Sequence, residues 1–195
     1  MPFLSFREII DIIIMTLFVG FIFSGYLSRY RRPDEDPLIT LQSKKAFLGV
    51  DLHDLQFAAL ITAPAIIFHE LAHKIVAIMF GLTAQFNAAY GWLTLGLVLK
   101  LMNFSFIFFV PAYVSISGSA THLQSALIAV AGPAFNLFLW GFSHFALKGQ
   151  WFLKKYSNIL FLTSKVNMFL FFFNMLPFFL FDGYKFFSGM FNAFF

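Results

Sequence analysis

The sequence contains no cysteine and very little charge. Of its 195 residues, 11% are charged, whereas a soluble globular domain carries about 25%. The absence of cysteine excludes disulfides, thiolate metal sites and cysteine nucleophiles. A bound transition metal would therefore need histidine, aspartate or glutamate ligands.

What the sequence does contain is apolar side chains. Hydrophobic residues make up 60% of the chain, including 32 phenylalanines. This composition predicts an all-α polytopic membrane protein with about four transmembrane helices and no separate soluble domain. The net charge of +4 falls in loops between apolar runs, which indicates membrane topology and not nucleic-acid binding. We expect an integral, multi-pass protein of the cell membrane, with the lipid bilayer as a partner and no nucleic acid.

Four apolar runs are long enough to be transmembrane helices. The first is followed by a polar, basic loop, and the last is interrupted by Pro177. The runs are residues 9–27, 55–80, 123–147 and 158–176.

The segment 81–122 is harder to interpret, because Lys100 and Asn103 lie within its apolar stretch 92–110. The basic loops after the first and third runs can lie on one side of the membrane only if this segment does not cross it. We therefore predict a small membrane-embedded hairpin or re-entrant layer. Within it, the alternating and β-branched stretch 111–118 predicts a short strand.

The motif HELAH places polar side chains in the middle of the second apolar run. On a helix, His69 and His73 lie on one face about 6 Å apart along the axis. Glu70 projects roughly 100° away, close enough to reach a water between them. HExxH is the zinc hydrolase pattern of two ligands and a general base. The alternative is a pair of core histidines with a snorkelling Lys74, but a glutamate flanked by histidines at membrane depth is hard to satisfy by packing.

A third ligand would have to lie at a similar depth. Apart from Glu70, Asp182 alone among the acids follows a long apolar run; the others lie near the N-terminus or in the first loop. Pro177 should unwind the preceding helix, and Gly183 allows the chain to turn beside a metal. The alternative for Asp182 is an interfacial acid at a helix end.

Three motifs follow one another in the order HELAH, AGPAFN (131–136) and NMLPFFLFDG (174–183). Together they resemble the site-2 protease family of intramembrane zinc metalloproteases, and specifically a compact archaeal-type member. The resemblance implies that His69, His73 and Asp182 bind one Zn²⁺ per chain and that Glu70 activates water. It also implies that Asn174 lies beside the site and supports substrate or oxyanion.

The middle motif also fits the family, and one residue departs from the family pattern. By the resemblance, Gly132, Pro133 and Asn136 would shape close packing against the catalytic helices, although an asparagine in a membrane helix is most typical of interhelical hydrogen bonding. Tyr184 stands where the family often has a second glycine.

The resemblance implies hydrolysis of peptide bonds within or near transmembrane segments of membrane-protein or peptide substrates. The chain would then divide into an N-terminal transmembrane helix and polar loop (1–54), an intramembrane metalloprotease core (55–185) and a short C-terminal tail (186–195). Two other functions fit an intramembrane cluster of histidine and glutamate. One is a metal or proton transporter; the other is a catalytically silent, protease-like binding protein.

Two rules give opposite orientations in the membrane. Positive loop charge places residues 28–54 and 148–156 in the cytoplasm, whereas the family resemblance implies the reverse. Acidic residues 34–36 weaken the charge bias of the first loop, so we favour the arrangement implied by the family.

Overall fold

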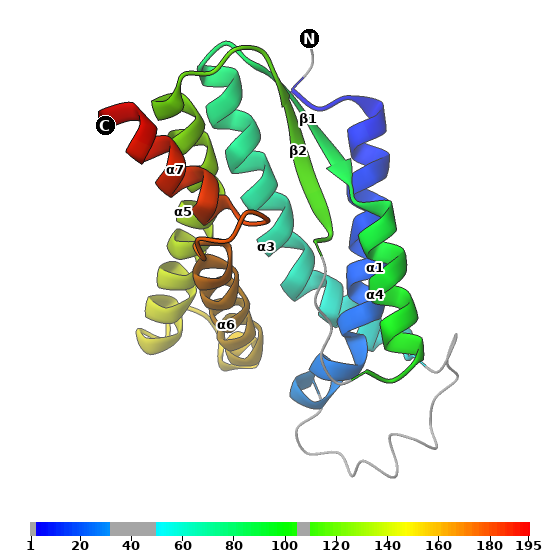
Figure 1. Cartoon of the computed structure of the whole chain (residues 1–195). Helices are drawn as coiled ribbons and strands as arrows, with labels where there is room; N and C mark the ends of the chain where they lie inside the picture. Colours follow the sequence, from blue (N-terminus) through cyan, green and yellow to red (C-terminus); the bar gives the residue numbers. More distant parts are fainter. Residues whose placement is uncertain (1–2, 32–49, 105–109) are drawn as a thin grey trace.

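The computed structural model describes residues 3–31, 50–104 and 110–195 (Figure 1). Long helices form a bundle, and a small two-stranded sheet lies against one side of it. The elements are α1 (Phe6–Arg31), α3 (Leu52–Met79), β1 (Thr83–Ala88), α4 (Tyr90–Leu101), β2 (Ala112–Ser117), α5 (His122–Lys148), the 3₁₀ turn η1 (Lys154–Tyr156), α6 (Ser157–Asn174) and α7 (Asp182–Phe194).

Among the described residues, three helices are long and apolar enough to cross a membrane: α1, α3 and α5. This finding confirms the predicted class, an all-α polytopic membrane protein. Helix α6 forms where the fourth span was predicted, but it has 18 residues and is not one of these three. At 1.5 Å per residue it is about 27 Å long, at the lower end of the length that crosses a bilayer.

Helix α3 occupies the middle of the molecule. It packs against α1 and the sheet on one side and against α5 and α6 on the other. A buried cluster that includes Met15, Val19, Phe86 and Leu93 joins α1, β1 and α4. Gly81 ends the α3 segment with a φ of 78°, the left-handed conformation that glycine adopts at little cost.

The segment between α3 and α5 forms a hairpin-like layer, as predicted. Strand β2 lies within the predicted 111–118 and pairs antiparallel with β1, with Phe86 opposite Val114. The sequence did not predict β1 or α4. Helix α4 has 12 residues, about 18 Å, which is too short to cross a bilayer. Residues 105–109 of the apolar stretch lie outside the described part.

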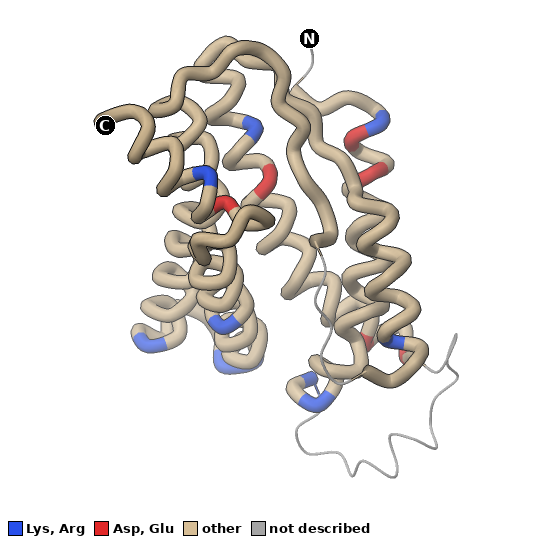
Figure 2. Tube along the Cα trace, in the orientation of Figure 1, with Lys and Arg blue, Asp and Glu red and all other residues tan. Residues whose placement is uncertain are grey.

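Because this layer returns to the end from which it started, the basic ends of the helices meet on one side. Figure 2 shows lysines and arginines gathered at one end of the bundle, where α1 ends and α5 is followed by η1. Lys100 does not face lipid at the centre of a span. It donates hydrogen bonds to Ser24 Oγ at 2.7 Å and to the Phe21 carbonyl, and so ties α4 to α1.

Two acids at the start of α1 hold the outer edge of β1. The Glu8 carboxylate accepts a hydrogen bond from Phe86 N at 2.7 Å and pairs with Lys74. The Asp11 carboxylate accepts from Ala88 N at 3.4 Å. Lys74 has a side chain only 3% exposed, so the snorkelling alternative was wrong. Its charge is neutralised inside the protein by Glu8 of α1.

The chain unwinds between α6 and α7, as Pro177 predicted. Gly183 permits this turn because an added Cβ would lie 2.4 Å from the Met175 carbonyl. Residues 186–194, expected to be a tail, continue the helix that begins at Asp182. Helix α7 packs along α5, and Gly189 allows close contact with the His122 carbonyl.

Candidate metal centre

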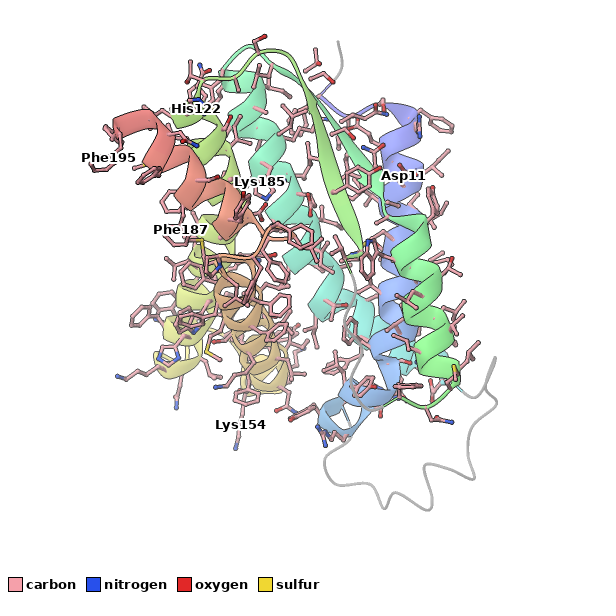
Figure 3. All side chains as sticks on the ribbon, viewed as in Figure 1. Asp11, His122, Lys154, Lys185, Phe187 and Phe195 are labelled. Atoms are coloured by element: carbon pink, nitrogen blue, oxygen red, sulfur yellow. The ribbon has the colours of Figure 1, made fainter. Side chains whose placement is uncertain are left out.

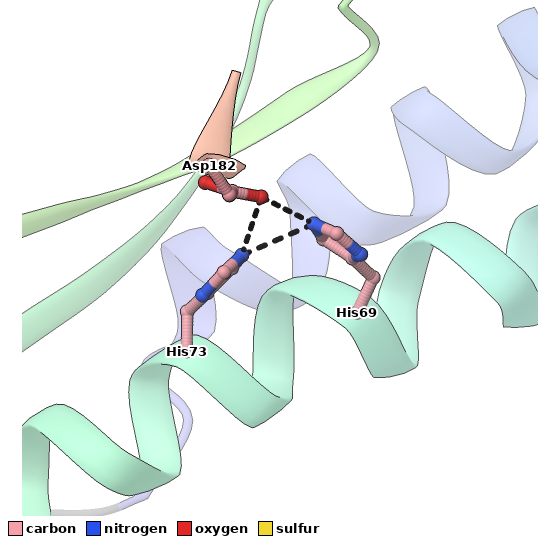
Figure 4. Close-up of side chains that lie close together, drawn as sticks. All are labelled: His69, His73 and Asp182. Carbon is pink, nitrogen blue, oxygen red and sulfur yellow. Dashed lines mark hydrogen bonds and ion pairs between the residues drawn. The ribbon is translucent and has the colours of Figure 1, made fainter. Parts of the chain in front are cut away.

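Three side chains from two distant parts of the chain converge on one point (Figure 4). The Nε2 atoms of His69 and His73 lie 3.1 Å apart. The Asp182 Oδ2 atom lies 3.1 Å from Nε2 of His69 and 3.2 Å from Nε2 of His73. Both histidines are buried. The sequence predicted the two histidines on one helix and Asp182 beyond an unwound turn, and the fold brings their donor atoms together.

The separation of these donor atoms fits a metal ion. Ligands held about 2.0–2.1 Å from a tetrahedral zinc ion lie roughly 3.3 Å from one another. The observed distances are 3.1–3.2 Å. Two imidazoles and one carboxylate are also a donor set that catalytic zinc sites use, with one position left for water or substrate. His69, His73 and Asp182 therefore fit zinc in both chemistry and spacing.

The second nitrogen of each imidazole also has a fixed partner. Nδ1 of His69 donates to Asn136 Oδ1 at 2.5 Å, and Nδ1 of His73 donates to the Ile128 carbonyl at 2.7 Å. A carbonyl only accepts, so each neutral ring carries its proton on Nδ1 and presents a bare Nε2. With both rings neutral, the two Nε2 atoms and the Asp182 carboxylate offer three donor atoms to a cation between them.

Asn136 joins helices, as is typical of an asparagine in a membrane helix, and it also orients the His69 imidazole. Its amide nitrogen donates to the Ala65 carbonyl at 3.1 Å and to Asn167 Oδ1 at 2.8 Å. These bonds leave its oxygen facing His69. Asn167 was not singled out in the sequence. It could have been noticed as a polar residue within the apolar run 158–176. In the structure its side chain is fully buried.

Gly132 gives the imidazoles their space. A Cβ at this position would lie 2.3 Å from Nε2 of His73 and 2.7 Å from Nε2 of His69. No side chain fits there without moving a ligand. The glycine of AGPAFN is therefore required by the rings themselves, which is more specific than general helix packing.

Glu70 and Asn174 line the same cavity as the three ligand residues. The cavity has a volume of about 1040 Å³ and lies between α3, β2 and the α5–α7 half of the molecule. Glu70 is 9% exposed and follows His69 directly in the chain. Asn174 ends α6 beside the unwound turn. The cavity is large enough for a peptide segment beside the ligand residues.

A comparison with curated proteins identifies a relative. A protein of Methanocaldococcus jannaschii named "Putative zinc metalloprotease MJ0611" is 34% identical over 186 residues, which cover 93% of this chain and 83% of that protein. The chain belongs to the family of this zinc metalloprotease. No family model and no solved structure matches it.

Membership of this family agrees with the geometry of the site. A metalloprotease needs a metal held by protein ligands, and the fold supplies two histidines and an aspartate at suitable distances. Two of these ligand residues lie on α3, one of the helices long and apolar enough to span a membrane.

Proposed function

We propose that this chain is an intramembrane zinc metalloprotease of the site-2 type, which hydrolyses peptide bonds within or near transmembrane segments. The convergence of His69, His73 and Asp182 beside Glu70 carries the proposal. The substrates would be membrane proteins or peptides, the enzyme would reside in the cell membrane, and one Zn²⁺ would be bound per chain.

In this proposal His69, His73 and Asp182 hold the zinc ion. When bound, zinc would supply Lewis-acid chemistry, polarising the scissile carbonyl and making water more acidic. Asn136 and the Ile128 carbonyl keep both Nε2 atoms unprotonated and aimed at the ion. Gly132 keeps the space in front of them open.

Glu70 acts as the general base. Its carboxylate accepts a proton from the attacking water and passes it to the nitrogen of the departing amine. Asn174 lines the same cavity and has an amide that can donate a hydrogen bond to the substrate carbonyl. Glu70 does this from a buried position, where such an interaction is stronger than in water.

Strand β2 is the element that we propose holds the substrate. Phe86 and Ala88 donate their N–H groups to α1, so they point away from β2. Val114 and Ala112 are the partners of these two residues in β2. In such pairs the backbone N–H and C=O groups of both residues face outward, so those of Val114 and Ala112 point away from β1, on the side of the cavity that both residues line. An unwound substrate segment can pair with this edge by β-strand addition. A helical segment would have to unwind first, because a helix shields its own peptide bonds.

The test is to measure bound zinc and cleavage of a single-span reporter on the same purified samples. Wild type should bind one zinc ion and cleave the reporter. Glu70→Gln should retain zinc and lose cleavage by at least about a hundredfold, since it removes the general base and keeps the shape. His69→Ala should lose both.

Other results would point to the competing functions. Zinc binding by wild type without cleavage of any reporter would favour a silent binding protein. Metal flux into vesicles that is unaffected by Glu70→Gln would favour transport.

A further inference from the structure

Lys185 is an exposed cation on the wall of the cavity. It lines the same cavity as the metal ligands, and it makes no ion pair with any residue that the structure describes. It is also close enough to interact electrostatically with Glu70.

The position of Lys185 follows from the helix on which it lies. Residues three apart share one face of a helix, so Lys185 lies next to Asp182 on the cavity face of α7. Ser188 and Asn192 continue this face and also line the cavity. Figure 3 shows Lys185 on the side of α7 towards α3, whereas Phe187 points outward.

The charge of the cavity beyond the metal site is entirely positive among the described lining residues. Arg29, Lys165 and Lys185 line it, and the acids that do so, Glu70 and Asp182, belong to the site. A cavity of this kind favours a substrate that brings a negative charge. Of the three cations, Lys185 is one helical turn from a metal ligand.

We propose that Lys185 forms a subsite for an acidic side chain of the substrate, close to the scissile bond. The inference rests on the proposed protease function. Lys185 is about 4.5 Å further along α7 than Asp182, and a bound strand advances about 3.3 Å per residue. The aspartate or glutamate recognised is therefore within about two residues of the bond that is cut.

The experiment scans one acidic residue along the reporter. Each position near the cleavage site carries Asp, Asn or Lys in turn, and kcat/KM is measured for wild type and for Lys185→Gln and Lys185→Glu. At one position wild type should cleave the Asp reporter about tenfold faster than the Asn reporter. Lys185→Gln should remove this preference, and Lys185→Glu should favour Lys at the same position.

Lys154→Gln is the matched control, because Lys154 carries the same charge and lies at the far end of the molecule (Figure 3). It should keep the wild-type preference, and bound zinc should be equal in all four proteins. An unchanged preference in Lys185→Gln, or an equal loss for every reporter, would overturn the subsite. Cleavage of the Asn reporters by wild type would show that the protease function stands even if the subsite does not.

Discussion

At the scale of single residues, both nitrogens of each imidazole in the proposed metal site have a defined neighbour. Nε2 faces the shared point, while Nδ1 of His69 and of His73 donates to an oxygen on α5. The orientation of the two imidazoles therefore depends on residues outside the triad of His69, His73 and Asp182. Two predictions follow from such positions on α5.

Gly132→Ala should abolish zinc binding. The new Cβ would overlap Nε2 of both histidines at 2.3 and 2.7 Å, and the rings cannot move without leaving their partners. Gly141→Ala is the control on the same helix, since nothing lies within 4 Å of a Cβ there. Zinc content of the purified variants measures the difference, and normal zinc in Gly132→Ala would contradict the geometry.

Asn136→Ala should weaken zinc binding by about 10–100-fold, the usual effect of losing the partner of a ligating histidine. The imidazole of His69 would then be free to rotate or to change tautomer. A competition titration with a zinc chelator measures the affinity. Asn167→Ala should weaken zinc binding less, because Asn167 acts on His69 only through Asn136. An equal or larger loss of affinity would show that Asn167 does not act through Asn136.

At the scale of secondary structure, the two edges of the small sheet differ. The edge of β1 is occupied by carboxylates from α1, and the edge of β2 faces the cavity. A strand can therefore be added only beside β2.

Val114→Pro should lower cleavage about tenfold or more without releasing zinc. Proline removes the N–H that faces the cavity, and a tenfold loss corresponds to about one hydrogen bond. The β1–β2 ladder should persist, because this N–H does not point towards β1. Val114→Ala retains the N–H and should cleave nearly normally. Reporter cleavage at wild-type rate by the proline variant would remove β2 as the substrate edge.

The Glu8–Lys74 pair links the sheet to α3, the helix that carries His69 and His73. Both side chains are almost completely buried, 4% and 3% exposed. Glu8→Gln leaves the Lys74 charge unpaired and should lower the free energy of unfolding by about 3–5 kcal/mol. The double variant with Lys74→Met removes both charges and should recover most of this loss. Unfolding in detergent micelles measures both variants, and additive losses would show that the two residues do not act as a pair.

At the scale of the whole molecule, the hairpin-like layer decides which loops share a side of the membrane. Because the segment between α3 and α5 returns to the end from which it started, α1 and α5 both end at the same end of the bundle (Figure 1). The chain has no cysteine, so a single introduced cysteine reports its own location.

Arg29→Cys and Lys154→Cys should react with a membrane-impermeant thiol reagent from the same side of sealed vesicles. Ser119→Cys, between β2 and α5, should react only from the opposite side. The measurement also decides between the orientation given by positive charge and that implied by the family. Labelling of residues 29 and 154 from opposite sides would mean that the intervening layer crosses the membrane.

The sequence by itself determined the features that depend on local pattern. Apolar runs predicted the long helices, the spacing of His69 and His73 placed them on one face, and Pro177 predicted the unwound turn before Asp182. Hydropathy, helical periodicity and proline sterics act over a few residues, so they can be read without knowing the fold.

Tertiary structure alone decided which distant groups meet. Glu8 and Lys74 lie far apart in the chain, and nothing local indicates that they form a buried pair. The same holds for the bonds from Asn136 to His69 and Asn167. Strand β1 was missed for the same reason: the carboxylates that satisfy its outer edge come from α1, which is distant in the chain. These features depend on how helices pack, and a polar side chain in an apolar run signals a partner without identifying it.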